Sequence, residues 1–165
     1  MTQIMTRTDD CIVRKVPVNR SRTPQAALDA TNRAQYTDRQ VVDSMPKGEG
    51  DEAEVIFFKP APDEYTRPGW MSEDGLEEAL ALRSLKAAPP DDVAAVDEAD
   101  PAFADDHPHG THWKDGDGRW CQAPFCRWYG ERAVRVFRRD RGWSDEWWFA
   151  GVRKAVLPKR EIVPN

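Results

Sequence analysis

From about residue 111 onward, apolar and polar positions alternate with a period of two, as in strands that bury one face. Groups of glycine, aspartate and other turn-forming residues interrupt this alternation about every ten residues. The segments between the turns lie at 111–114, 119–128, 132–139 and 144–154. Consecutive strands joined by short turns pair as hairpins, so the pattern predicts an antiparallel β-meander of three to four strands.

The first two thirds of the chain carry helix signals instead. N-cap residues and apolar positions at helical spacing predict short helices at 23–31, 37–45, 72–86, 93–99 (capped by Asp91 and Asp92) and 101–106. Residues 54–59 are β-branched or aromatic and apolar on both faces, which predicts a central strand. The predicted fold class is α+β: short helices in the N-terminal two thirds, and a C-terminal tryptophan-rich antiparallel β-meander in a sheet of four to five strands.

The length of 165 residues suits one domain. Residues 1–22 are predicted to form a flexible N-terminal arm, within which 12–18 has the composition of a short strand that Pro17 would confine to a sheet edge. The single domain then spans 23–165. It comprises an acidic helical part at 60–106 and a basic aromatic β-meander at 111–154.

The composition indicates a folded protein of a reducing compartment. Apolar residues make up 39% of the chain, and seven tryptophans are more than a disordered chain carries. The three cysteines show no disulfide framework. The start of the chain is polar, and no run of about 18 apolar residues occurs. We therefore expect a cytoplasmic protein with free thiols and no membrane partner.

The net charge of −5 is unevenly distributed. The segments 1–50, 51–118 and 119–165 carry +2, −13 and +6. Two interpretations remain open. The acidic middle either lies against the basic C-terminal part and neutralises it, or the two form separate faces with different partners.

Five candidate metal ligands lie close together in the sequence: His107, His109, His112, Cys121 and Cys126. Nitrogen and sulfur ligands are those that zinc prefers, and hairpins can supply them in pairs. The Cys-x4-Cys spacing is unusual for zinc, however, and on an unbroken strand it puts the two thiols on opposite faces unless the chain bulges at Pro124. The sequence therefore predicts no cofactor, with a zinc protein or metal-dependent enzyme as the alternative.

The last two predicted strands place aromatic and arginine side chains on one face: Arg135, Phe137, Arg139, Trp147 and Arg153. Such a face suits a protein hot spot, and it equally suits single-stranded nucleic acid. A third interpretation is that the acidic helices cover it. No catalytic constellation is recognisable, so the favoured function is a non-catalytic interaction module. It would bind a macromolecule, preferably a protein, through this face or through the acidic helices, with nucleic acid as the alternative.

Six stretches of the chain also resemble a family of small proteins found mostly in genomes of uncultivated bacteria and in metagenomes. They are residues 22–31, 35–43, 48–52, 95–105, 110–115 and 147–154. The resemblance covers most of the chain from about residue 20. It implies a bacterial protein that folds as one unit, and it carries no assigned activity or site residues.

Overall fold

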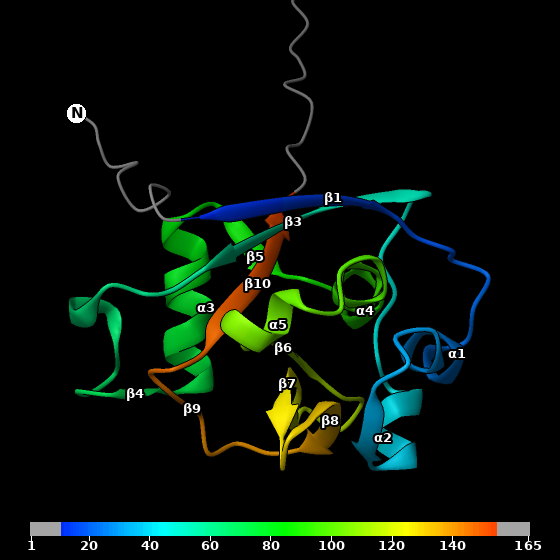
Figure 1. The fold of residues 1–165 in the computed structure, drawn as a ribbon. Helices are drawn as coiled ribbons and strands as arrows, with labels where there is room; N and C mark the ends of the chain where they lie inside the picture. The colour runs from blue at the N-terminus through cyan, green and yellow to red at the C-terminus, as the bar shows by residue number, and fades with distance from the viewer. Residues whose placement is uncertain (1–10, 155–165) are drawn as a thin grey trace, which may run out of the picture.

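The computed structural model describes residues 11–154, which form an eight-stranded mixed sheet with helices on both faces and a separate two-stranded ribbon (Figure 1). The predicted α+β class is confirmed. Predictions for residues 1–10 and 155–165, including part of the arm and the end of the domain, lie outside the described residues.

The elements follow one another along the chain with short connections. The helices are α1 (Pro24–Asp29), α2 (Arg39–Asp43), α3 (Glu73–Leu82), α4 (Pro90–Ala99) and α5 (Phe103–Asp106), with a 3-10 turn η2 (Pro62–Glu64). The strands are β1 (Ile12–Pro17), β2 (Ala34–Thr37), β3 (Glu52–Phe58), β4 (Trp70–Met71), β5 (Leu85–Ala87), β6 (His109–Lys114), β7 (Trp120–Trp128), β8 (Glu131–Arg138), β9 (Trp143–Ser144) and β10 (Trp148–Arg153).

Side-chain caps start the helices where the sequence predicts them. Thr23 accepts a hydrogen bond from the Ala26 amide at the start of α1, and Ser72 accepts one from the Gly75 amide at the start of α3. Helix α4 differs, because it begins at Pro90 and not after Asp91 and Asp92. Proline suits the first helical position, and the two aspartates bind Arg20 instead of capping the helix.

The meander prediction is correct for three strands and wrong for the fourth. Strands β6, β7 and β8 pair antiparallel in sequence order, but β10 crosses the sheet to lie between β3 and β6, parallel to β6. Phe149 and Ala150 of β10 are both buried, so this strand needs cover on both faces, which a central position provides. The outer edge of β8 pairs with β2 instead, and the sheet is larger than the predicted four to five strands.

The other end of the sheet corrects the predicted arm. Strand β1 pairs with β3 along its whole length, and Arg20 and Arg22 form ion pairs with α4, so residues 12–22 are part of the domain. The edge position expected for a strand ending in Pro17 is confirmed. The central position of β3, between β1 and β10, is also confirmed.

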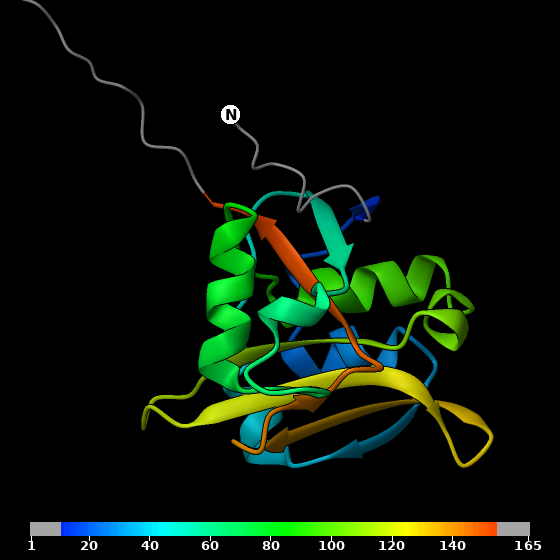
Figure 2. The same cartoon turned by 90° about the vertical axis from the view of Figure 1, so that its left-hand side faces the viewer.

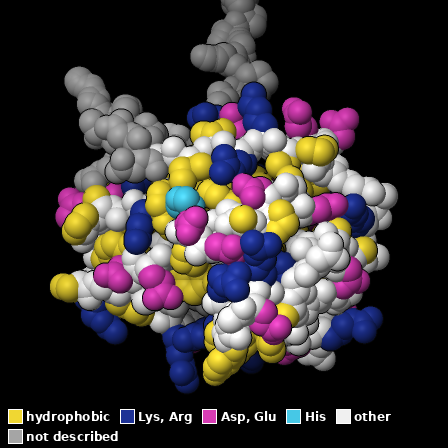
Figure 3. Space-filling model, in the orientation of Figure 1, with side chains coloured by type: hydrophobic (Ala, Val, Ile, Leu, Met, Phe, Trp, Pro, Cys, Tyr) yellow, Lys and Arg dark blue, Asp and Glu magenta, His cyan; other side chains and the backbone are white. Residues whose placement is uncertain are grey.

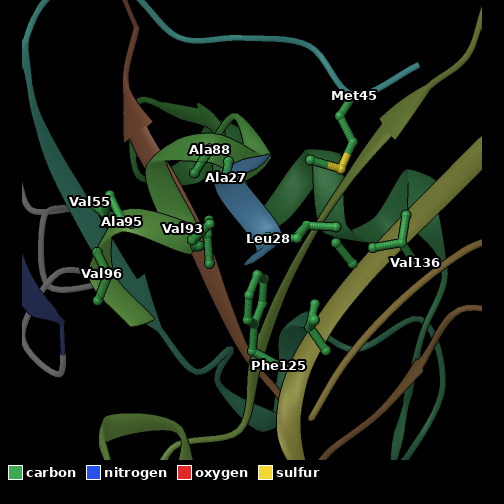
Figure 4. Close-up of a cluster of buried hydrophobic side chains, with 14 of the residues drawn as sticks. Ala27, Leu28, Met45, Val55, Ala88, Val93, Ala95, Val96, Phe125 and Val136 are labelled. Carbon is green, nitrogen blue, oxygen red and sulfur yellow. The ribbon is translucent and has the colours of Figure 1, made fainter. Parts of the chain in front are cut away.

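Two hydrophobic cores lie on opposite faces of the sheet. The larger one packs α1, α2, α4 and α5 against one face, with Leu28, Val93, Phe125 and Val136 among its members (Figure 4). The smaller one packs Leu76 and Leu80 of α3 against the other face. Figure 2 shows α3 (green) and α4 on opposite sides of β10 (orange). Within residues 11–154, none of the helices has the length and apolarity needed to cross a membrane.

Ion pairs connect the acidic middle of the chain to both basic ends. Asp91 and Asp92 bind Arg20, and Glu98 binds Arg22. Toward the C-terminus, Asp105 binds Arg132. Basic and acidic side chains are accordingly interspersed over the face in Figure 3. These ion pairs therefore neutralise much of the charge difference between the acidic middle of the chain and its basic ends.

Candidate functional site

The structure does not bring the five predicted metal ligands together. The buried His109 ring lies between Asp97 Oδ2 and the His107 carbonyl oxygen, each 2.8 Å from a ring nitrogen. The His112 ring lies on the other face of β6, with its two nitrogens 2.6 Å from Glu73 Oε1 and 2.7 Å from Glu77 Oε2. The odd separation of His109 and His112 on one strand explains their opposite directions.

The two cysteines are separated for the same reason. Strand β7 keeps one register with β8 from Cys121 opposite Arg138 to Cys126 opposite Ala133, so Pro124 causes no bulge. Burial raises the pKa of both thiols. Among the residues that the structure describes, no three His, Cys, Asp or Glu side chains are grouped to hold a metal ion. The five side chains that the sequence suggested are therefore not gathered into one set of ligands in residues 11–154.

Four of the five predicted partner-binding residues line one groove. Arg135, Phe137, Arg139 and Trp147 surround a hollow of about 360 Å³ between the β7–β8 hairpin and the β4–β9 ribbon. Arg153 lies elsewhere, because the crossover of β10 carries it beside β3, where it forms an ion pair with Glu54 (3.0 Å). We call the hollow the arginine–aromatic groove. Its other lining residues are Trp70, Gln122, Pro124, Arg141, Gly142, Trp143, Ser144 and Glu146.

The β4–β9 ribbon forms a wall of the groove that several hydrogen bonds hold in place. Trp70 Nε1 donates to the Arg141 carbonyl oxygen (2.8 Å), and Gln122 Nε2 donates to the Gly142 carbonyl oxygen (3.1 Å). Trp143 packs directly over Gly110 of β6, where a β-carbon would lie 2.5 Å from the indole ring. The glycine therefore allows the ribbon to approach the sheet closely, and the groove is preformed.

The arginines of the groove lack acidic partners. Arg127 and Arg132 bind Asp105, and Arg138 binds Asp115. Within residues 11–154, Arg135, Arg139 and Arg141 form no ion pair with a carboxylate, although Glu146 also lines the groove. The alternation along the strand predicts that Arg135 and Arg139 lie on the same face.

Instead of carboxylates, two of these guanidinium groups lie over aromatic rings. Arg135 is 4.5 Å from the Trp128 ring centre and 4.8 Å from that of Phe137, and Arg139 is 5.4 Å from the latter. Arg139 Nε is buried and has no hydrogen-bond partner among the residues that the structure describes. Burial lowers the pKa of Arg139, and the charges of Arg135 and Arg141 add to this effect. The groove is thus a concentrated positive site with unused donors.

Two parts of this site were missed by the sequence analysis. Trp70 belongs to a strand of two residues, which is too short to give a periodic signal. Arg141 follows β8 in a segment that the sequence marks only as a turn. Neither could be assigned to the groove without the pairing of β4 with β9.

The fold and the site define an α+β protein with a helix-covered mixed sheet and a positively charged aromatic groove beside it. A scan against models of known protein families, a search of curated proteins and a search of solved structures found no match. The resemblance to small bacterial proteins therefore stays a prediction.

Proposed function

We propose that this chain is a non-catalytic binding module that holds an anionic segment of a macromolecular partner in the arginine–aromatic groove. The observation that carries the proposal is the absence of carboxylate partners, within residues 11–154, for the three arginines that line this hollow. A protein is the class of partner that the sequence favours, and both an acidic segment of a protein and a nucleic acid present suitable anions.

The energetics of the groove favour an anion. Three guanidinium groups in one hollow repel one another, and the unused donor of Arg139 is costly while it remains buried. A carboxylate or phosphate would neutralise this charge and accept hydrogen bonds from the free N–H groups. Hydrogen bonds to charged groups contribute about 1.5–3 kcal/mol each. The aromatic rings would add contact area at the same place.

The acidic helices give weaker support for a partner surface. Six of the eight carboxylates on α3 and α4 already have cationic or histidine partners, and Asp74 and Glu78 are the exceptions among them. Carboxylates that already form ion pairs or hydrogen bonds within the molecule contribute little to binding another protein. The geometry therefore favours the groove over the acidic face.

The thiols also support a non-catalytic role. Burial raises the pKa of Cys121 and Cys126, so both remain protonated at neutral pH. A protonated thiol is a poor nucleophile.

The proposal can be tested by titrating the protein with anionic probes and following its tryptophan fluorescence. The probes are poly-L-glutamate and single-stranded oligothymidylate, because they carry the two kinds of anion. We expect at least one of them to bind, and Arg139→Gln and Arg135→Gln each to weaken that binding about tenfold or more.

Arg153→Gln is the matched control, because Arg153 belongs to the same predicted face but lies outside the groove. It should change the affinity by less than about twofold. Failure of both probes to bind, or an equal loss in all three variants, would overturn the proposal.

A further inference from the structure

The arginine–aromatic groove continues into two further hollows. The first, of about 420 Å³, is lined by Gly118, Arg119, Trp120, Arg138, Arg139 and Asp140, and it shares Arg139 with the groove. The second, of about 350 Å³, shares Trp120 with the first. The main-chain hydrogen bond from Arg139 N to the Trp120 carbonyl oxygen (2.9 Å) connects the strands at this junction. Each hollow thus shares one lining residue with the next, and we call this series of three hollows the track.

Lysines line the far end of this track. Lys47, Lys86 and Lys114 all border the last hollow, and all three are exposed. Lys47 Nζ donates to the Arg20 carbonyl oxygen, and Lys114 Nζ lies 5.0 Å from the Trp120 ring centre. In the part of the chain that the structure describes, none of these lysines forms an ion pair with a carboxylate. Their charges are available to a ligand.

The track is positive although the chain as a whole is negative. Eight lysine and arginine side chains but only three acidic ones line the three hollows, whereas the chain carries a net charge of −5. Glu77, one of the three acids, is already bound to His112. Such a local excess attracts a ligand that carries several negative charges in succession.

Aromatic rings lie between the positive groups along the track. Trp120 stands at the junction of two hollows and is half-buried, with the His112 ring stacked against it at 4.1 Å. Phe137 and Trp147 line the groove at the other end. Alternation of cations with partly exposed rings suits a chain of phosphates joined to flat bases.

We propose that this track binds single-stranded nucleic acid, with phosphates on the arginines and lysines and unpaired bases against Trp120 and the groove rings. This inference rests on the proposed function of the groove and names its partner. An acidic peptide needs only one cationic hollow, whereas the continuation of the positive charge past Trp120 matches a regularly charged backbone. Bases in a duplex are paired and stacked on one another, so their faces would not reach these rings.

The test uses the full chain with labelled single-stranded oligothymidylate, its duplex with oligoadenylate, and poly-L-glutamate. Affinities are measured by anisotropy over a series of salt concentrations. We expect the single strand to bind more tightly than the duplex and its affinity to fall steeply with salt.

Two variants probe the part of the track beyond the groove. Lys86→Gln with Lys114→Gln should weaken binding about tenfold and reduce the slope of log affinity against log salt by about 1.4, since each phosphate contact to a single strand contributes about 0.7. Trp120→Leu should weaken binding about tenfold without changing the slope, because stacking releases no counterions. Arg153→Gln is the control for both.

The outcomes separate this inference from the proposed function. Binding of poly-L-glutamate without binding of the oligonucleotide would leave the groove proposal standing and overturn the nucleic-acid partner. Oligonucleotide binding that depends on Arg139 but not on Lys86, Lys114 or Trp120 would overturn the extended track. Binding of neither probe would overturn both proposals.

Discussion

Two groups of arginines in this molecule have opposite surroundings. Arg33 is buried under α4, where its guanidinium donates to Asp97 and to the carbonyl oxygens of Ala133, Pro101 and Cys126. Arg139 lies in the groove with two other arginines and with a buried Nε that has no partner. The first arrangement joins elements that are distant in sequence. The second leaves three cations without an ion-pair partner within residues 11–154, which is the pattern expected of a binding site.

The largest loss of stability should come from removing the carboxylate that pairs with Arg33. Asp97→Asn removes the charge that compensates Arg33, and the side chains of both residues are almost fully buried. An uncompensated buried cation costs about 3–5 kcal/mol, so we expect the free energy of unfolding in urea to fall by this amount. Asp106→Asn, at an exposed aspartate nearby, is the control and should cost less than about 0.5 kcal/mol. Equal losses of stability in the two variants would mean that the buried Arg33–Asp97 pair contributes no more than an exposed carboxylate.

A second group of buried ionisable residues should make stability depend on pH. Burial lowers the pKa of His112, but the hydrogen bonds and charges of Glu73 and Glu77 outweigh this and raise it above 6.5. The hydrogen bond from His112 likewise lowers the pKa of Glu77 below 4.5. The stabilisation from the histidine is complete below its unfolded pKa, and it is lost as the pH rises through the higher folded pKa.

The contribution of Glu77 has the opposite sign: it is present above the ordinary pKa and is lost as the pH falls through the lowered one. Stability from this group should therefore be greatest between the two ranges. Urea midpoints measured from acidic to mildly alkaline pH should decline on both sides. His112→Gln should remove the decline on the alkaline side, and a pH profile unchanged by this substitution would contradict the assignment.

Substitution of Arg139 in the groove, unlike substitution of Asp97, should not lower the free energy of unfolding. Arg139→Met removes a repelled and partly desolvated cation but keeps most of the side-chain volume. We expect the free energy of unfolding to stay unchanged or rise by up to about 1 kcal/mol, while binding of the anionic probe is lost. A destabilisation of about 2 kcal/mol or more in thermal or urea melts would show that Arg139 is structural.

The smallest effect is expected at Arg153. Its ion pair with Glu54 is largely exposed, so Arg153→Gln should change the free energy of unfolding by no more than about 0.5 kcal/mol. The urea midpoint measures this directly. A larger loss would indicate that the edge of the sheet near β3 depends on this pair.

Local signals predicted local structure well. Thr23 and Ser72 cap helices at the predicted starting points 23 and 72, because capping depends on residues within one turn. The period-two pattern similarly identified β6, β7 and β8, since short turns leave neighbouring strands little choice but to pair. The alternation of side chains along β8 also placed Arg135, Phe137 and Arg139 on one face, and these three residues line the groove.

Non-local pairing was beyond the reach of the sequence. No signal within β10 indicates that it leaves β8 and inserts between β3 and β6. Arg153 was therefore assigned to the groove face, although it lies beside β3. The partners of His109 and His112 lie on α4 and α3, and the sequence does not show that these helices cover opposite faces of β6. The five candidate metal ligands were grouped by their proximity in sequence, and strand alternation separates them.

The central claim is that the groove arginines, and not the buried ones, receive an anion. It is tested most directly by following the arginine Nε–Hε signals in NMR spectra during a titration with the anionic probe that binds, poly-L-glutamate or single-stranded oligothymidylate, with signals assigned by single Arg→Lys variants. The account predicts large shifts for Arg135, Arg139 and Arg141, and unchanged signals for Arg33 and Arg153. Shifts at Arg33 or Arg153 that equal those of the groove, or no shift at Arg139, would contradict it.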